Sequence, residues 1–305
     1  MRSGLEAGQR SLRVLANRQL PSGGWPYTQG SSQVALEPTC LALLALSSHE
    51  GPARDLAVRF LLDAQNPNGS WPAFAGDDPG GSGLAGLALF ALNQCGIRDE
   101  ATDRGFQWLL NLRGWESHWL WRWKFKTSDR HVRFNPDKFG WPWMPETVSW
   151  VVPTAYSLLA LNASFKTPPP DSVRSRVRRG VEMLYDRICP QGGWNAGNGV
   201  VYRQPLASHL DTTAIALLAL RSEPINEFSA ASLDWLGQHA QTCCAPWSLA
   251  WGILALDAYG CRTNQLLARL ADTSDMDGIK DCATLAVTAL ALDCALEENI
   301  FKVAA

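Results

Sequence analysis

One nine-residue pattern recurs along the whole chain, and this repetition limits the fold more than any other feature of the sequence. Each copy is rich in Leu and Ala, and all of them end in Ala-Leu. The closest copies start 36 residues apart, which is enough for one helix, a loop, a second helix and a return turn. The copies are PTCLALLAL, LAGLALFAL, PTAYSLLAL, TTAIALLAL, SLAWGILAL and TLAVTALAL, starting at Pro38, Leu84, Pro153, Thr212, Ser248 and Thr284.

A segment of mixed polarity precedes each block. In the second of these segments Val58, Leu61 and Leu62 form an apolar stripe beside charged residues, as in a half-exposed helix. The blocks themselves are apolar on all sides, which is typical of buried helices. Six half-exposed helices alternating with six buried ones predict an all-α protein, an (α/α)6 toroid in which an outer ring sheathes an inner one. We expect residues 1–305 to form a single domain.

The composition excludes several classes of protein. A net charge of −2 and a pI near 6.2 argue against a nucleic-acid partner. The eight cysteines show no metal-ligand spacing, so we predict no metal site. The chain has no signal-peptide pattern and no apolar run long enough to span a membrane. We therefore expect a cytoplasmic protein without a transmembrane segment, which leaves room for peripheral membrane contact.

Several loops before the blocks share a Gln, one or two Gly residues and a Trp. The loops QLPSGGW, QNPNGSW and CPQGGW end at Trp25, Trp71 and Trp194. Glycine permits a tight turn after a helix, and the indole covers the turn with a large apolar face. We interpret these loops as repeated structural braces.

These residues resemble the QW repeats of squalene–hopene and oxidosqualene cyclases, within the wider prenyltransferase/squalene-oxidase repeat family. The stretch AVRFLLDAQNPNGSW, residues 57–71, carries the resemblance best. It implies the toroid over nearly the whole chain. It also implies a class II terpene-cyclase-like enzyme, of the isomerase or lyase type, that starts cyclisation of an isoprenoid by protonation in an apolar central cavity.

One segment is similar to the acidic motif D-x-D-D-T-A of bacterial squalene cyclases, whose middle aspartate protonates the substrate. The matching residues run from His209 to Ala214, and the middle aspartate is retained as Asp211. The resemblance implies Asp211 as general acid, with His209 as its orienting partner. An alternative is that Asp211 is a helix N-cap, since Asp is favoured there. The equivalent positions of the other blocks hold Glu37, Gly83, Val152, Trp247 and Ala283, so only one of the six blocks has Asp there and the fold does not require it.

The third repeat carries a long insertion rich in tryptophan, from Arg113 to Val152, and the start-to-start spacing there reaches 69 residues. The alternation WLWRWKF from Trp119 to Phe125 predicts a short strand or hairpin over the ring opening. Three interpretations remain open: a lid whose aromatic side chains line the pocket, a grip on a diphosphate, or a structural plug. The expected substrate-binding residues are Trp119, Trp121, Trp123, Phe125, Phe139, Trp141, Trp143, Trp150, Arg133 and Glu146.

The resemblance to the cyclases also implies a ligand and partners for this protein. The ligand is an isoprenoid or another apolar small molecule, and no cofactor is expected, although a diphosphate substrate would bring Mg²⁺. Related cyclases enclose their substrate between two helical domains, so either the insertion or a second protein closes the cavity here. Two alternatives remain: a non-catalytic toroid that binds a lipid or a protein, and a protein-prenyltransferase-like subunit.

Overall fold

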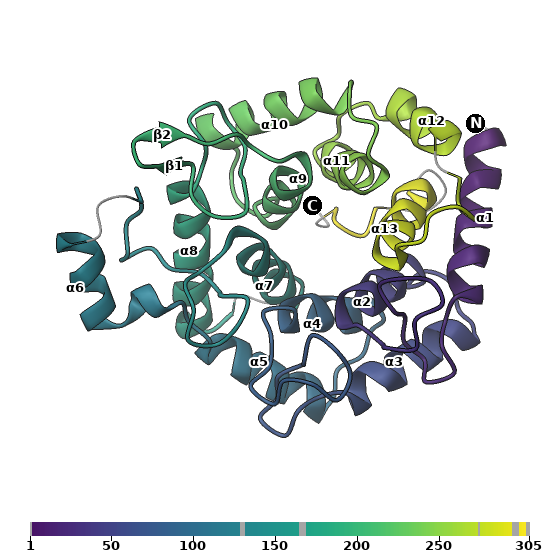
Figure 1. Cartoon of the computed structure of the whole chain (residues 1–305), viewed down its shortest axis with the longest axis horizontal. Helices are drawn as coiled ribbons and strands as arrows, with labels where there is room; N and C mark the ends of the chain where they lie inside the picture. The colour runs from purple at the N-terminus through teal and green to yellow at the C-terminus, as the bar shows by residue number, and fades with distance from the viewer. Residues whose placement is uncertain (1, 129–131, 165–168, 274, 295–298, 303–305) are drawn as a thin grey trace.

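The protein is a double ring of α-helices, as the repeat predicts. The computed structural model describes residues 2–128, 132–164, 169–273, 275–294 and 299–302. Figure 1 shows the helices in two concentric layers. The six inner helices begin at or next to the repeated blocks and are α2 (Leu36–Ala45), α4 (Ala85–Gln94), α7 (Val151–Ser164), α9 (Leu210–Ala219), α11 (Pro246–Ala258) and α13 (Cys282–Asp293). The outer helices are α1 (Arg2–Asn17), α3 (Pro52–Asp63), α5 (Glu100–Asn111), α8 (Asp171–Asp186), α10 (Glu227–Ala240) and α12 (Asn264–Thr273).

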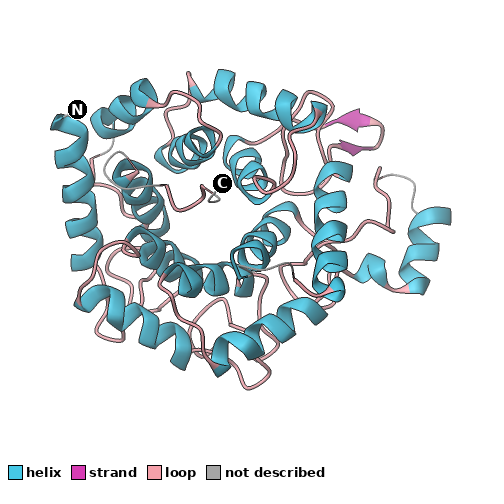
Figure 2. Cartoon of the chain, turned by 180° about the vertical axis from the view of Figure 1, so that it is seen from behind, coloured by secondary structure: helices cyan, strands magenta, loops and turns pink. Residues whose placement is uncertain are grey.

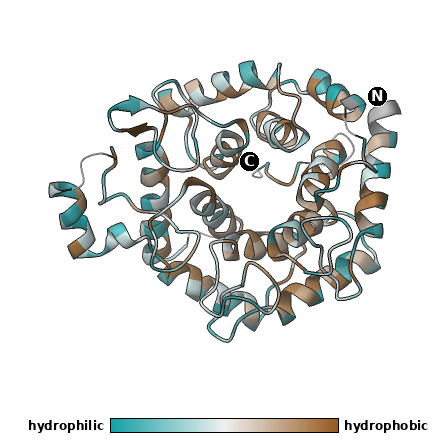
Figure 3. Ribbon diagram, in the orientation of Figure 1, coloured by the Kyte–Doolittle hydropathy of each residue, from teal (hydrophilic) through white to brown (hydrophobic). Residues whose placement is uncertain are grey.

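Each inner helix contacts the next one around the ring, and α13 contacts α2, so that the inner ring closes. Almost every residue of the inner helices is buried, in agreement with their uniform apolarity. The outer helices bury one stripe, and in Figure 3 hydrophilic and hydrophobic stretches alternate along α1 and α10. The (α/α)6 toroid predicted from the repeat is confirmed.

The Trp of each brace holds an outer helix to an inner one. The indole N–H of Trp71 donates to the carbonyl of Leu61 at 2.7 Å, near the end of α3. The Gln65 side chain donates to the carbonyl of Ala101 in the next outer helix. Trp25 and Trp194 make the same bond to the carbonyls ten residues before them. The interpretation of these loops as structural braces is confirmed.

A threonine in the second position of three blocks completes the brace. The backbone N–H of Trp194 donates to the Thr213 hydroxyl at 2.9 Å. Thr39 and Thr154 accept equivalent bonds from the backbones of Trp25 and Trp141. The Thr213 that matches the cyclase motif therefore has a structural role in this protein.

The first part of the third-repeat insertion lies outside the ring. It contains the 3₁₀ turn η1 (Trp115–Ser117) and helix α6 (Trp119–Thr127), and a two-stranded hairpin of β1 (Val200–Val201) and β2 (Gln204–Pro205) lies on the same side of the molecule. Figure 2 shows α6 and the hairpin beyond the circle of outer helices. The prediction of a strand over the ring opening is wrong, because α6 is a helix and projects away from that opening.

The C-terminal segment turns back into the inner ring. Phe301 is buried and stacks on Phe90 of α4, with ring centroids 5.5 Å apart. The Asn299 amide donates to the carbonyl of Leu254 and to the Asp257 carboxylate of α11, both at 2.9 Å. The segment thus fills the end of the ring at which the inner helices finish.

Candidate active site

Two acidic side chains lie at the end of the ring where the inner helices begin. The C-terminal segment fills the other end. Glu37 and Asp211 each occupy the second residue of their helix, α2 and α9, and these helices stand three places apart in the six-membered ring. Both side chains are half-buried, so that a ligand can reach them. We call this pair, together with Tyr27, Tyr156 and Trp247, the acidic rim.

Asp211 bonds to a side chain of the neighbouring inner helix. Its Oδ2 accepts a 2.9 Å hydrogen bond from the indole Nε1 of Trp247, in the first turn of α11. The N-cap of α9 is His209, and the cap makes no side-chain hydrogen bond to the helix. The helix-cap alternative for Asp211 is therefore wrong. His209 is exposed, and within the described part of the chain it makes no hydrogen bond to Asp211.

Glu37 is surrounded differently from Asp211. Its Oε2 accepts a 2.7 Å hydrogen bond from the Tyr27 hydroxyl. Although part of the side chain reaches solvent, burial raises the pKa of Glu37, and the negative charge of Asp281 raises it further. The hydrogen bond from Tyr27 lowers this pKa more than Asp281 raises it, and Tyr156 lowers it slightly, but burial is the largest effect. The carboxyl group of Glu37 therefore keeps its proton to a higher pH than an exposed glutamate does.

The hydroxyl of Tyr156, on α7, lies close enough to both Glu37 and Asp211 to feel their charges. Its side chain is fully buried, which raises the pKa of its hydroxyl, and the charges of Glu37 and Asp211 raise that pKa further. In the described structure this hydroxyl makes no hydrogen bond of normal geometry, although it lies close enough to Glu37 to lower the pKa of that carboxyl group. Buried polar groups in native proteins nearly always have a partner, so this hydroxyl is available to a ligand or a water molecule.

A row of aromatic rings leads from Asp211 into the interior of the ring. Trp247 meets Trp251 edge-to-face at 5.9 Å, and Trp251 lies 6.0 Å from Phe301. Trp251 is fully buried, and its Nε1 is a second buried donor without a partner in the described structure. Tyr156 and Trp251 occupy the same position of their blocks, on the two helices that flank α9. The aromatic row and the acid on α9 thus share one side of the ring.

The side chains expected to bind substrate are not gathered at this rim. Trp119 is 71% and Trp123 60% exposed on α6, so these two do not face the interior. Trp121 stacks on Trp115, and Phe125 meets Phe134 edge-to-face, both within the insertion. The prediction that this part of the insertion lines the ring opening as a lid is wrong, because α6 packs on its own segment.

Other members of that predicted set have structural surroundings. Trp141 is the brace of the third repeat: it is fully buried and donates its Nε1 hydrogen to the carbonyl of Leu109 at 2.8 Å. The guanidinium of Arg176 lies over the Trp141 ring at 3.3 Å and within 5.5 Å of the Phe139 ring.

The remaining members of the predicted set are spread over the molecule. Trp143 and Trp150 are half-buried beside the braces. Glu146 lies in an exposed turn with φ 63°, and Arg133 lies near the β1–β2 hairpin.

A third carboxylate lies near the acidic rim. Asp281, near Glu37, caps α13 through a hydrogen bond from the backbone N–H of Thr284 at 2.6 Å. Over the described ranges, no group of three or more His, Cys, Asp or Glu side chains is placed to hold a metal ion.

None of the helices in the described ranges has both the length and the apolar character of a membrane span.

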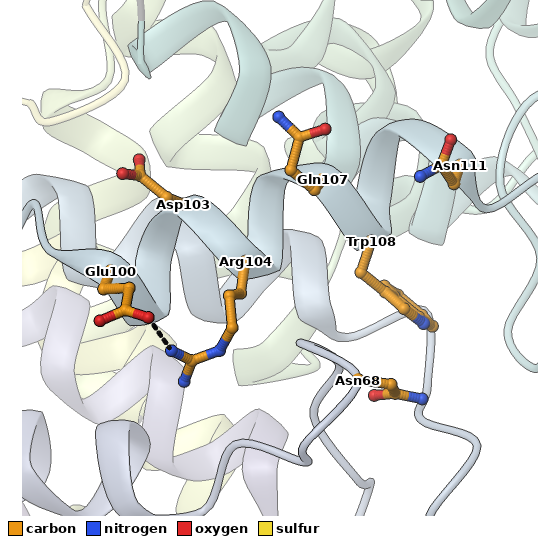
Figure 4. A pocket seen from close by; sticks show the side chains of 7 residues that line it. All are labelled: Asn68, Glu100, Asp103, Arg104, Gln107, Trp108 and Asn111. Carbon is orange, nitrogen blue, oxygen red and sulfur yellow. Dashed lines mark ion pairs between the residues drawn. The ribbon is translucent and has the colours of Figure 1, made fainter.

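Pockets on the outer surface are separate from the acidic rim. Figure 4 shows one of them, of about 400 Å³, beside helix α5. Trp108 and Asn68 form one side of it, and Arg104 lies 3.6 Å from Glu100 on the other. Because α5 is an outer helix, this pocket does not reach the acidic rim.

Comparison with known proteins identifies the fold. The sequence matches no family model and no sequence of a curated protein. The structure is similar to a protein from Actinoplanes (TM-score 0.61, 16% identity, covering 96% of this chain and 100% of that one). It is similar to a type II terpene cyclase from Scytonema (TM-score 0.60, 14% identity, 96% and 98%) and to an α-amylase from Clostridium perfringens (TM-score 0.62, 10% identity, 96% and 98%). At these identities the likeness establishes the toroid fold alone.

Proposed function

We propose that this protein is an acid–base enzyme that cyclises an isoprenoid by protonation at the acidic rim. The observation that carries the proposal is the position of Asp211, hydrogen-bonded to Trp247 at the head of an aromatic row that runs into an apolar ring. Aromatic faces attract cations, and a positive charge created beside this row is therefore stabilised.

The two carboxyl groups of the acidic rim have different surroundings. Asp211 accepts the indole hydrogen bond at the head of the aromatic row, whereas burial favours the protonated form of Glu37. We assign Glu37 as the proton donor and Asp211 as the acceptor, which moves the donor role expected for Asp211 to the opposite side of the ring. A general acid and a general base both need a position within hydrogen-bond reach of the reacting atoms.

The reaction is balanced in protons. Glu37 transfers its proton to one carbon of an alkene, and the resulting cation is attacked by the π electrons of a second alkene, which forms a ring. Asp211 then removes a proton from the carbon next to the final cation, and a new double bond forms. The product is an isomer of the substrate, and solvent returns the proton from Asp211 to Glu37.

The experiment is an incubation of the purified protein with squalene and with geranylgeranyl diphosphate in deuterated water. The proposal predicts a cyclic isomer that contains one solvent deuteron. Glu37→Gln and Asp211→Asn should each abolish its formation, because neither amide transfers a proton at neutral pH. Full turnover by both variants would exclude the acidic rim as the active site.

A second candidate is an enzyme that acts on a glycosidic bond. It is favoured by the two carboxyl groups on opposite helices and by the edge-to-face pair of Tyr27 and Phe74, 5.9 Å apart, beside Glu37. Glycoside hydrolysis uses two such carboxyl groups, one on each side of the bond. Release of reducing sugar from an oligosaccharide panel, lost in the same two variants, would select this reaction over cyclisation.

A further inference from the structure

A groove on the outer surface has the character of a binding site that neither the acidic rim nor the ring interior includes. Its volume is about 1060 Å³. It lies between the insertion, the end of α8, the β1–β2 hairpin and the start of α10, which Figure 1 shows together at one edge of the molecule. We call it the basic groove.

Backbone pairing builds one wall of the basic groove. Val132 of the insertion forms a bridge to Val201, and the backbone N–H of Arg133 donates to the carbonyl of Val200 at 3.2 Å. The hairpin turn consists of Tyr202 and Arg203, with φ of 50° and 62°, the left-handed conformation that a tight two-residue turn requires. These contacts bring Arg133 and Arg203 to the same groove although they are distant in the sequence.

The charges of the groove do not cancel. The Nζ of Lys126 is neutralised by Asp137 at 2.6 Å. The carboxylate of Asp186 is paired with Arg187 at 2.6 Å and also accepts a backbone hydrogen bond at 2.8 Å. Three further cations line the groove and form no ion pair with any described residue: Arg133, Lys138 and Arg203.

Apolar rings cover the rest of the groove. Phe125 and Phe134 meet edge-to-face with centroids 5.0 Å apart. On the opposite side Phe228 lies 6.4 Å from Tyr185, and about half of Phe228 is exposed. The hydroxyl of Tyr185 is buried without a hydrogen-bond partner among the described residues. Among the described residues, the groove therefore combines positive charge without an ion-pair partner, a hydroxyl without a hydrogen-bond partner and exposed aromatic surface.

We propose that the basic groove binds a phosphate or diphosphate ester that carries an apolar substituent. Arginine offers several N–H donors in one plane and bonds phosphate oxygens in pairs, which suits Arg133 and Arg203. Lys138 adds a third positive charge. The apolar substituent packs on Phe228 and Phe125. This proposal is independent of the reaction at the acidic rim.

Calorimetric titration of the full chain with pyrophosphate and with geranyl diphosphate tests the groove. Geranyl diphosphate should bind more tightly than pyrophosphate, because only the former covers the aromatic surface. Arg133→Gln and Arg203→Gln should each weaken binding of both probes by about tenfold, the effect of one lost charge-assisted bond. Phe228→Ala should weaken geranyl diphosphate selectively. Added salt should weaken binding of both probes.

The matched control is Arg98→Gln, which removes the same charge from an exposed arginine between α4 and α5, away from the groove. Thermal unfolding of every variant verifies that it remains folded. Sedimentation with vesicles of phosphatidylcholine and phosphatidic acid separates the two sources of such a ligand: binding restricted to vesicles assigns a lipid headgroup, and binding of the soluble probes assigns a free ester. Absence of binding in both assays, or an equal loss in Arg98→Gln, overturns the proposal.

Discussion

The indole Nε1 of Trp247 donates a 2.9 Å hydrogen bond to the carboxylate of Asp211, across the interface between two inner helices. Asp211 lies inside α9, after the N-cap His209, and this bond rather than a capping bond holds its carboxylate. The bond also fixes the orientation of the carboxyl group at the edge of the aromatic row.

Asp211→Asn should leave thermal stability nearly unchanged and abolish turnover. Asparagine keeps a side-chain oxygen that can accept the bond from Trp247, but it does not take up a proton. Trp247→Phe is the companion variant, because it removes the donor and leaves Asp211 intact, and we expect a loss of roughly 1 kcal/mol in unfolding free energy. Retained turnover in Asp211→Asn would contradict the assigned role of the carboxylate.

The stability of the protein should depend on the ionisation of Glu37. Burial raises the pKa of Glu37 in the folded state, so the folded state binds its proton more tightly than the unfolded state does. The stabilisation is complete at acid pH and is lost as pH rises through the raised pKa. Urea unfolding of wild type and Glu37→Gln across this window should show a steeper decline for wild type. Parallel curves would mean that Glu37 titrates normally.

Trp71→Phe should destabilise the protein by roughly 1–3 kcal/mol, because the buried carbonyl of Leu61 loses its donor. Trp123→Phe is the matched control, since Trp123 is 60% exposed and makes no brace. Chemical unfolding measures both. Equal losses in the two variants would remove the distinction between brace and insertion tryptophans.

Phe301→Ala should cost roughly 3–5 kcal/mol, the usual effect of emptying a buried phenylalanine site. The expected readout is a lower midpoint of thermal unfolding. Phe228→Ala provides the comparison, because about half of that ring is exposed and little packing is lost with it. A midpoint unchanged by Phe301→Ala would show that the C-terminal segment does not occupy the ring in solution.

The repeat made the toroid predictable, because helices buried on all sides require a second layer around them. The brace was predictable too, since glycine, glutamine and tryptophan recur together. The predicted strand in the insertion is a helix in the structure for a physical reason. Its alternation resembles a strand, but Trp121 and Phe125 are also one helical turn apart and pack inward, while Trp119 and Trp123 face outward.

The sequence predicts only one of the two acids of the acidic rim as a site residue. Asp211 lies in a segment similar to the cyclase motif, whereas no sequence motif marks Glu37. Closure of the ring places α2 opposite α9, and that relation exists only in three dimensions. Tyr156 and Trp251 share one register position, but their unpartnered polar atoms depend on how the neighbouring side chains pack.

The contacts of α13 with both α1 and α2 have a consequence for biosynthesis. The backbone of the first repeat also pairs with the start of α13, through the bond from the Cys282 N–H to the Tyr27 carbonyl at 2.7 Å. Early hairpins leaving the ribosome therefore expose apolar edges whose partners have not yet been translated. Contacts between distant parts of a chain form slowly. We expect nascent chains that lack α13 to need a chaperone, and the last hairpin to set the moment at which the protein becomes resistant to protease.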